Sequence, residues 1–300
     1  MTYATKTITV TIQLRPGPVT GGVPASIGGS GADTITLTNH RVLAQVSTVV
    51  NNTLTVGGQR IILRIYGMTL SEMNQLTVAG RQWQQRNNSV AVQAGDEGGQ
   101  MTTVFNGQIT DAFPDFTETP ESAFVIVGMV GRGIAMKPVP PTTYPGATDT
   151  VAIMRSLAGS AGLAFENNGV SVQLASPYLA GTLMRQMATV ARAANIYAYI
   201  DGPMNTLAIW PKTGSRGGAV PVISPANGMI LYPTYESVYV HVRTLFDPSV
   251  KFGGQVTIQS QLTAANGNWT VVQHLDYTLS SQMPDGPWEM SFQGTNASKT

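Results

Sequence analysis

Strict alternation of apolar and polar residues at both ends of the chain constrains its fold more than any other feature. In residues 5–14, TKTITVTIQL, every second residue from position 8 onward is apolar. Residues 255–262 and 268–279 alternate in the same way around an Asn266-Gly267 dipeptide. A period of two is typical of a β-strand with one buried face, and Asn-Gly is a frequent hairpin turn. The sequence therefore predicts strands at both ends.

The middle of the chain has a helical period instead. One helix is predicted over about residues 149–157, with Thr148 as its N-cap. A second helix is predicted to begin at Ser176, and its apolar stripe repeats every three or four residues: Leu179, Leu183, Met187, Val190 and Ala194. Short hairpins are predicted over 163–174 and 196–210. The fold class predicted from these patterns is α+β, mostly β.

Proline and glycine divide the chain into regions. Residues 137–146, KPVPPTTYPG, contain four prolines and predict a linker. The predicted domains are a mainly β domain over 1–135, a small α+β module over 147–212 and a β region over 219–293. Residues 16–33 hold six glycines and three prolines, and this composition is typical of a long loop or flexible arm.

Charged residues are scarce, with only 17 basic and 16 acidic residues among 300, or 11%. An ordinary domain carries about 25%. Burying an amide or hydroxyl that has a hydrogen-bond partner costs less free energy than burying an ion. A charge-poor surface therefore favours burial against other proteins, and the chain is predicted to be part of an assembly.

Composition also excludes several functional classes. The net charge is +1 and no basic run occurs, whereas binding to nucleic acid needs several cations on one face. Cysteine is absent, which excludes disulfides and thiolate metal sites. No stretch reaches the roughly 18 apolar residues of a membrane span, so no membrane anchor is expected. Three solitary histidines, His40, His241 and His274, predict no metal site.

Two alternative functions depend on particular side chains. A glycan hydrolase needs two close carboxyl groups, one with a raised pKa. Its candidates are Asp96, Glu97, Asp111, Asp115, Glu118 and Glu121, all in segments predicted to be turns in water. A carbohydrate-binding module needs exposed aromatic side chains, and its candidates are Trp83, Trp210, Trp269 and Trp288. A tryptophan in an alternating strand more often belongs to a core or an interface.

The C-terminal region resembles the baseplate hub proteins of bacteriophage tails. The resemblance consists of several loose motifs in a fixed order: Thr244 to Pro248, Gly254 to Ser260, Asn266 to Trp269, His274 and Pro284 to Trp288. Upstream, VFNGQITDAF at 104–113 and the segment 147–169 are similar to further family segments. The likeness covers about residues 55–290.

This resemblance implies a structural protein of the virion, and not an enzyme. Hub proteins of this kind form homotrimers in which each subunit contributes two β-barrel domains like those of the tail tube, here flanking the α+β module. The ring joins the hexameric tail tube to the threefold tail spike beside other baseplate proteins. Its lumen passes the tape measure protein and then DNA. No cofactor is implied, and assembly is expected in the host cytoplasm.

Seven residues are predicted to shape the C-terminal β region. Gly254, Asn266, Gly267 and Gly286 are expected to set turns. Leu245, Phe246 and Pro248 are expected to form a barrel corner. None of these is predicted to be catalytic or to bind a cofactor or metal. The alternatives of a tail-associated glycan hydrolase or a carbohydrate-binding tail-tip module stay open at this point.

Overall fold

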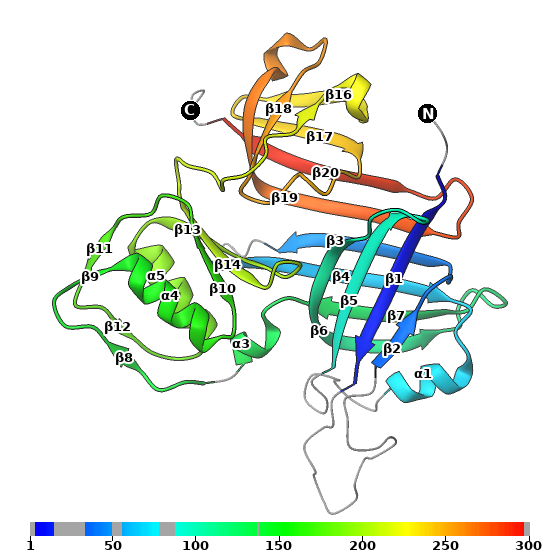
Figure 1. Cartoon of the computed structure of the whole chain (residues 1–300), viewed down its shortest axis with the longest axis horizontal. Coiled ribbons are helices and arrows are strands. Elements are labelled where there is room, and N and C mark those ends of the chain that lie inside the picture. The colour runs from blue at the N-terminus through cyan, green and yellow to red at the C-terminus, as the bar shows by residue number, and fades with distance from the viewer. Residues whose placement is uncertain (1–3, 15–33, 50–55, 78–87, 137, 297–300) are drawn as a thin grey trace, which may run out of the picture. The chain divides into compact units, whose positions relative to one another are not determined.

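The computed structural model describes residues 4–14, 34–49, 56–77, 88–136 and 138–296 (Figure 1). Two compact units emerge, each assembled from three separate stretches of chain. Unit 1 comprises Met1–Val46, Arg60–Arg132 and Thr278–Trp288. Unit 2 comprises Ser47–Gln59, Gly133–Tyr277 and Glu289–Thr300. The predicted arm at 16–33 lies outside the described residues, and the division into three consecutive domains stays a prediction.

Unit 1 is built on one sheet with the strand order β3-β4-β7-β6-β5-β1-β2. Its strands are β1 (Lys6–Gln13), β2 (Thr34–Leu37), β3 (Val42–Val49), β4 (Val56–Tyr66), β5 (Ser89–Asp96), β6 (Thr102–Asp115) and β7 (Ala123–Met129). The pairs from β4 through β2 are antiparallel. Among the described residues, no pairing between β2 and β3 closes this sheet into a barrel.

The alternation in the sequence produces the core of unit 1. In β1, Ile8, Val10 and Ile12 are buried, which confirms the predicted strand. The first turn of helix α1 (Leu70–Leu76) is fixed by a capping box, in which Thr69 and Glu72 bond each other's backbone N–H groups. The segment predicted as a turn from residue 111 is strand up to Asp115, because β6 pairs with β7 along its whole C-terminal half.

Unit 2 contains the predicted α+β module. Helices α4 (Thr150–Ser160) and α5 (Leu183–Ala193) pack against a three-stranded sheet of β10 (Ala164–Asn167), β14 (Thr206–Pro211) and β13 (Ile196–Asp201), as Figure 1 shows. The short pairs β8 (Thr142–Thr143) with β12 (Tyr178–Leu179) and β9 (Ala147–Asp149) with β11 (Gln173–Ala175) lie beside the helices. Helix α3 (Arg132–Met136) precedes the module.

Three local predictions in the module are wrong in detail. The second helix does not begin at Ser176, because Gly181 has a φ of +95° and Thr182 is the N-cap. The first helix is capped by Asp149 and not by Thr148. Residues 163–174 form no hairpin: β10 pairs with β14 and β11 pairs with β9. These long-range pairings override the local Asn-Gly turn signal. The apolar stripe and the β13–β14 hairpin are confirmed.

The C-terminal strands of unit 2 follow the order β16-β17-β20-β19-β18-β15. The elements are β15 (Val222–Ile223), η1 (Pro225–Asn227), β16 (Met229–Glu236), β17 (Tyr239–Leu245), β18 (Gln255–Ile258), η2 (Thr263–Ala265), β19 (Gly267–Ser281) and β20 (Trp288–Thr295). Strands β16 and β17 are separated at Ser237, where the chain turns with a φ of +52°. The predicted fold class, mostly β and α+β, is confirmed.

Candidate functional site

A buried arginine, Arg216, is the centre of the most extensive polar network in unit 2. It lies in the segment between β14 and β15, and its side chain is 2% exposed. Its backbone N–H donates to the carbonyl of Gly253 at 2.6 Å, and it forms an isolated parallel bridge with Gly254. The segment is thereby fixed to the turn that precedes β18.

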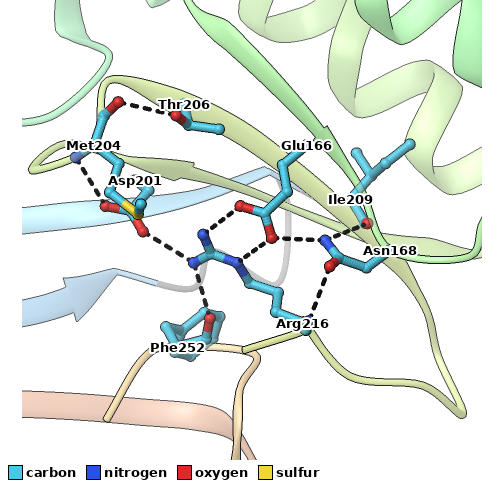
Figure 2. A network of polar contacts seen from close by, with 9 residues as sticks. Glu166, Asn168, Asp201, Met204, Thr206, Ile209, Arg216 and Phe252 are labelled. Carbon is cyan, nitrogen blue, oxygen red and sulfur yellow. Dashed lines mark hydrogen bonds and ion pairs between the residues drawn. The ribbon is translucent and has the colours of Figure 1, made fainter. Parts of the chain in front are cut away.

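The guanidinium group of Arg216 bonds three other parts of the chain (Figure 2). Two of its nitrogens donate to the carboxylate of Glu166 in β10, at 2.8 and 3.2 Å. The remaining terminal nitrogen donates to Asp201 in β13 at 2.9 Å and to the carbonyl of Phe252 at 3.2 Å. A planar fork suits this arrangement, because one edge of the group, Nε with Nη2, meets Glu166 and Nη1 on another edge meets Asp201.

The partners of Arg216 are themselves held in place. Asn168 donates to Glu166 at 2.8 Å and accepts a hydrogen bond from the backbone of Gly217 at 2.9 Å. Asp201 accepts a bond from the backbone of Met204 at 3.2 Å. We call Glu166, Asn168, Asp201 and Arg216 the Arg216 cluster. Every member is bonded to another part of the protein, so the cluster joins segments rather than presenting a free group to a substrate.

Charge pairing outweighs burial in this cluster. Burial alone would raise the pKa of Glu166, but the hydrogen bonds and charge of Arg216 hold that pKa below its ordinary value. Burial alone would lower the pKa of Arg216, but the bonds and charges of Glu166 and Asp201 raise it. Sequence analysis missed Arg216, because a single arginine in the glycine-rich stretch TGSRGG gives no signal of a distant partner.

The carboxylate candidates do not form a hydrolytic pair. Asp96 is bonded to Lys6 across β1 and β5. Asp115 accepts two hydrogen bonds from Thr117, which hold its pKa below the ordinary value, whereas a catalytic acid needs a raised pKa. Glu121 is paired with Arg41 at 2.9 Å. The described candidates are thus ordinary surface carboxylates.

The tryptophan candidates do not form a sugar platform either. Trp210 is fully buried and packs against Tyr197 and Phe252, with ring centroids 5.5 and 6.3 Å away. Trp269 is fully buried too, and its indole N–H donates to the carbonyl of Ala265 at 2.8 Å. Trp288 is partly buried beside the ammonium group of Lys6. Trp83 lies outside the described residues.

Two of the histidines predicted to be solitary are neighbours. His241 in β17 and His274 in β19 have ring centroids 5.7 Å apart, although 33 residues separate them. Strand β20 lies between these strands and brings Gln293 opposite His241. Glu236 lies 3.9 Å from the His241 ring, and Asp276 is close enough to act on the charge of His274. In the described part of the chain, no three His, Asp or Glu side chains meet to hold a metal.

Replacing His274 by Gln is expected to weaken the acid sensitivity of the fold. Burial lowers the pKa of His274, and nearby His241 adds to that effect while Asp276 opposes it. The unfolded chain therefore takes up the proton more readily, and stability falls as pH drops from about 6.5. Urea unfolding of both proteins from pH 7.5 to 5 measures this. An unchanged slope in His274→Gln would contradict the assignment.

The four predicted turn residues lie in four different settings. Gly267 has a φ of +126°, which only glycine adopts readily. The side chain of Asn266 bonds the backbone N–H and C=O of Ser260 at 2.7 and 3.0 Å. A Cβ on Gly286 would lie 2.1 Å from the hydroxyl of Ser280. Gly254 forms the bridge to Arg216. Their role in a barrel stays a prediction.

The predicted corner residues lie at the end of β17. Leu245 is 51% exposed, whereas Phe246 packs edge-on against Tyr277 with centroids 5.3 Å apart. Pro248 is exposed in the following turn, where Asp247 bonds Ser249. Other large apolar side chains are more exposed still, notably Leu231. These exposed side chains suit contacts with other proteins better than they suit chemistry.

Comparison with solved structures shows which proteins share this fold. The 43 kDa tail protein of prophage MuSo2 from Shewanella oneidensis is similar with a TM-score of 0.61 at 8% identity, over 96% of this chain and 97% of that one. A tail protein from Neisseria meningitidis MC58 gives 0.61 at 9% identity over 97% of both chains. The E. coli c3393 protein, a type VI secretion component with structural similarity to T4 tail proteins gp27 and gp5, gives 0.51 at 8% identity over 86% of this chain and 73% of that one. The fold is that of phage tail proteins.

Sequence comparison then gives the family. The model of the baseplate hub gp41 family matches residues 44–288, and the chain belongs to this family. No curated protein sequence matches it. The family is a structural one and not an enzyme family, so the chain is a structural component of a phage tail baseplate, located in the virion with other tail proteins. No helix in the described residues is long and apolar enough to cross a membrane.

Proposed function

We propose that this chain is the hub subunit of a phage baseplate, forming a homotrimeric ring that joins the hexameric tail tube to the threefold tail spike. The observation that carries the proposal is the match to the baseplate hub family over residues 44–288. The scarcity of charge and the exposed apolar side chains of both units support burial between subunits. The subunits are made and assembled in the host cytoplasm.

The ring surrounds a lumen through which the tape measure protein and then DNA pass. A net charge of +1 supports this role, because a strongly cationic channel would hold the phosphates and slow the passage of DNA. The two tail-tube-like barrels of each subunit would alternate around the ring and present pseudo-sixfold symmetry to the tube. A lumen lined densely by Lys and Arg would contradict this part of the proposal.

The absolute mass in solution tests the ring. One subunit has a mass of 31.8 kDa, so light scattering should report about three times that mass, near 95 kDa. Class averages from electron microscopy should show a threefold ring with an open centre. A monomer that persists at high concentration, alone and with its tube and spike proteins added, would overturn the proposal.

A further inference from the structure

The hairpin formed by β6 and β7 in unit 1 exposes two large aromatic side chains. Phe113, near the end of β6, is 46% exposed, and Phe116, in the connecting turn, is 52% exposed. In the isolated subunit, these two phenylalanines expose apolar surface whose burial would be favourable in free energy. Aromatic side chains are enriched at the centres of protein interfaces. The hairpin therefore has the composition of a contact surface.

This hairpin is braced before it meets any partner. Asp115 accepts hydrogen bonds from the backbone and the hydroxyl of Thr117, at 3.1 and 2.6 Å. The hydroxyl of Thr119 donates to the carbonyl of Phe116 at 2.7 Å. Arg64 pairs with Asp115 at 3.3 Å, which ties the turn to β4. A surface held in this way loses little conformational entropy when it binds.

The hairpin is also the most acidic part of the chain. Residues 111–121 hold four of the 16 acidic residues. Asp115 and Glu121 are paired with arginines of the same unit. Asp111 and Glu118 are exposed, and within the described residues neither has an ion pair. We call Asp111, Phe113, Phe116 and Glu118 the hairpin surface.

Helices α4 and α5 of unit 2 carry the opposite charge. Their exposed residues include Arg155, Arg185 and Arg192, and neither helix contains an acidic residue. Arg185 and Arg192 are seven residues apart, which places them on the same side of α5. Tyr178, in β12, is 63% exposed and adds an aromatic side chain. We call these four residues the helical face.

We propose that the hairpin surface of one subunit docks on the helical face of a second copy of this chain. The two surfaces are complementary in charge: in a chain with so few charges, one exposed element is acidic and aromatic and another is basic. A contact between two different surfaces of identical subunits is heterologous, and such contacts close into rings when the rotation permits. The inference rests on the proposed ring and names a contact that holds it together.

Charge reversal tests the contact. The first variant carries Asp111→Lys with Glu118→Lys, and the second carries Arg155→Glu with Arg185→Glu. All four side chains are exposed, so thermal unfolding should match wild type. Each variant should need about a tenfold higher protein concentration to form the ring, measured by light scattering at low salt. A matched control for the first variant, Glu97→Lys with Glu236→Lys, makes the same change of charge elsewhere and should assemble normally.

Combining the two reversed surfaces, in one chain or by mixing, distinguishes a contact between copies from a contact within one chain. A variant with all four changes should regain the ring, and mixing the two reversed variants should give mixed complexes that neither forms alone. Normal assembly of both reversed variants while wild type forms rings would overturn this inference and leave the proposed function intact. Wild type that is monomeric at all concentrations would overturn both. Loss of binding to another tail protein with the ring intact would assign the hairpin surface to that protein and overturn the contact between copies.

Discussion

Replacing Arg216 by Met is expected to lower the free energy of unfolding by about 3 kcal/mol. The change removes the only cation that bonds both Glu166 and Asp201 in the Arg216 cluster, and it leaves the carbonyl of Phe252 without this donor. Uncompensated buried carboxylates are costly, although the side chain of Glu166 keeps 31% of its surface in water, which places the loss at the low end of the range. Urea unfolding followed by tryptophan fluorescence measures it.

Arg243→Met is the matched control. Arg243 pairs with Glu289 through two hydrogen bonds of 2.9 and 2.7 Å, but its side chain is 53% exposed. Exposed pairs contribute less than about 1 kcal/mol, so the control should unfold almost as wild type does. Equal losses in the two variants would show that burial does not set the strength of the Arg216 cluster.

The Arg216 cluster should lose its contribution to stability in acid. The pKa of Glu166 is lower in the folded protein than in the unfolded chain, so its contribution is full above about pH 4.5 and is lost as pH falls further. Arg216→Met should therefore show a smaller loss of stability between pH 5 and pH 3 than wild type. A parallel decline in both proteins would contradict the role given to this ion pair.

Gly253→Ala is expected to destabilise unit 2 by about 3 kcal/mol, through two effects that add. Gly253 has a φ of +81°, which an alanine adopts only with strain. A Cβ there would lie 2.6 to 2.9 Å from ring atoms of Trp210, which is fully buried and has no room to move. The same glycine accepts the backbone bond from Arg216, so the clash would also disturb the cluster. Thermal unfolding measures the effect.

Gly162→Ala separates strain from the clash. Gly162 has a φ of +71°, but a Cβ there would meet no atom within 4 Å. In this control, only the strain of the left-handed backbone should lower the free energy of unfolding, by about 1 kcal/mol. If Gly253→Ala were no worse than Gly162→Ala, the tight packing of Trp210 against this turn would be refuted.

Local patterns predicted the elements well where neighbours in sequence determine them. The alternation of residues 5–14 identified β1, and the stripe from Leu183 to Val190 identified the buried side of α5, because both depend on one repeating face. Element ends were less predictable, since a single residue such as Thr182 decides where a helix starts. The resemblance of the C-terminal motifs to baseplate hubs identified the family correctly.

Side chains that meet through the fold were not predictable from this sequence. The pairing of β10 with β14 brings Glu166 toward Asp201. Arg216, 15 residues after Asp201, then comes back to bond both carboxylates. His241 and His274 meet only because β17, β20 and β19 are neighbours. No local pattern contains these distances, so both were missed. The carboxylates and tryptophans that sequence reasoning offered for catalysis or sugar binding are explained, where described, by pairing and by the core.

The interleaved make-up of the two units determines when each can be completed during synthesis. Unit 1 needs Thr278–Trp288, and unit 2 needs Ser47–Gln59 as well as Glu289–Thr300. Domains of consecutive residues fold one after another as they leave the ribosome. Here unit 1 stays incomplete until Thr278–Trp288 has emerged, long after its first strands have been made. Truncation before residue 278 would therefore leave both units unfinished, and a nascent chain stalled there should bind chaperones.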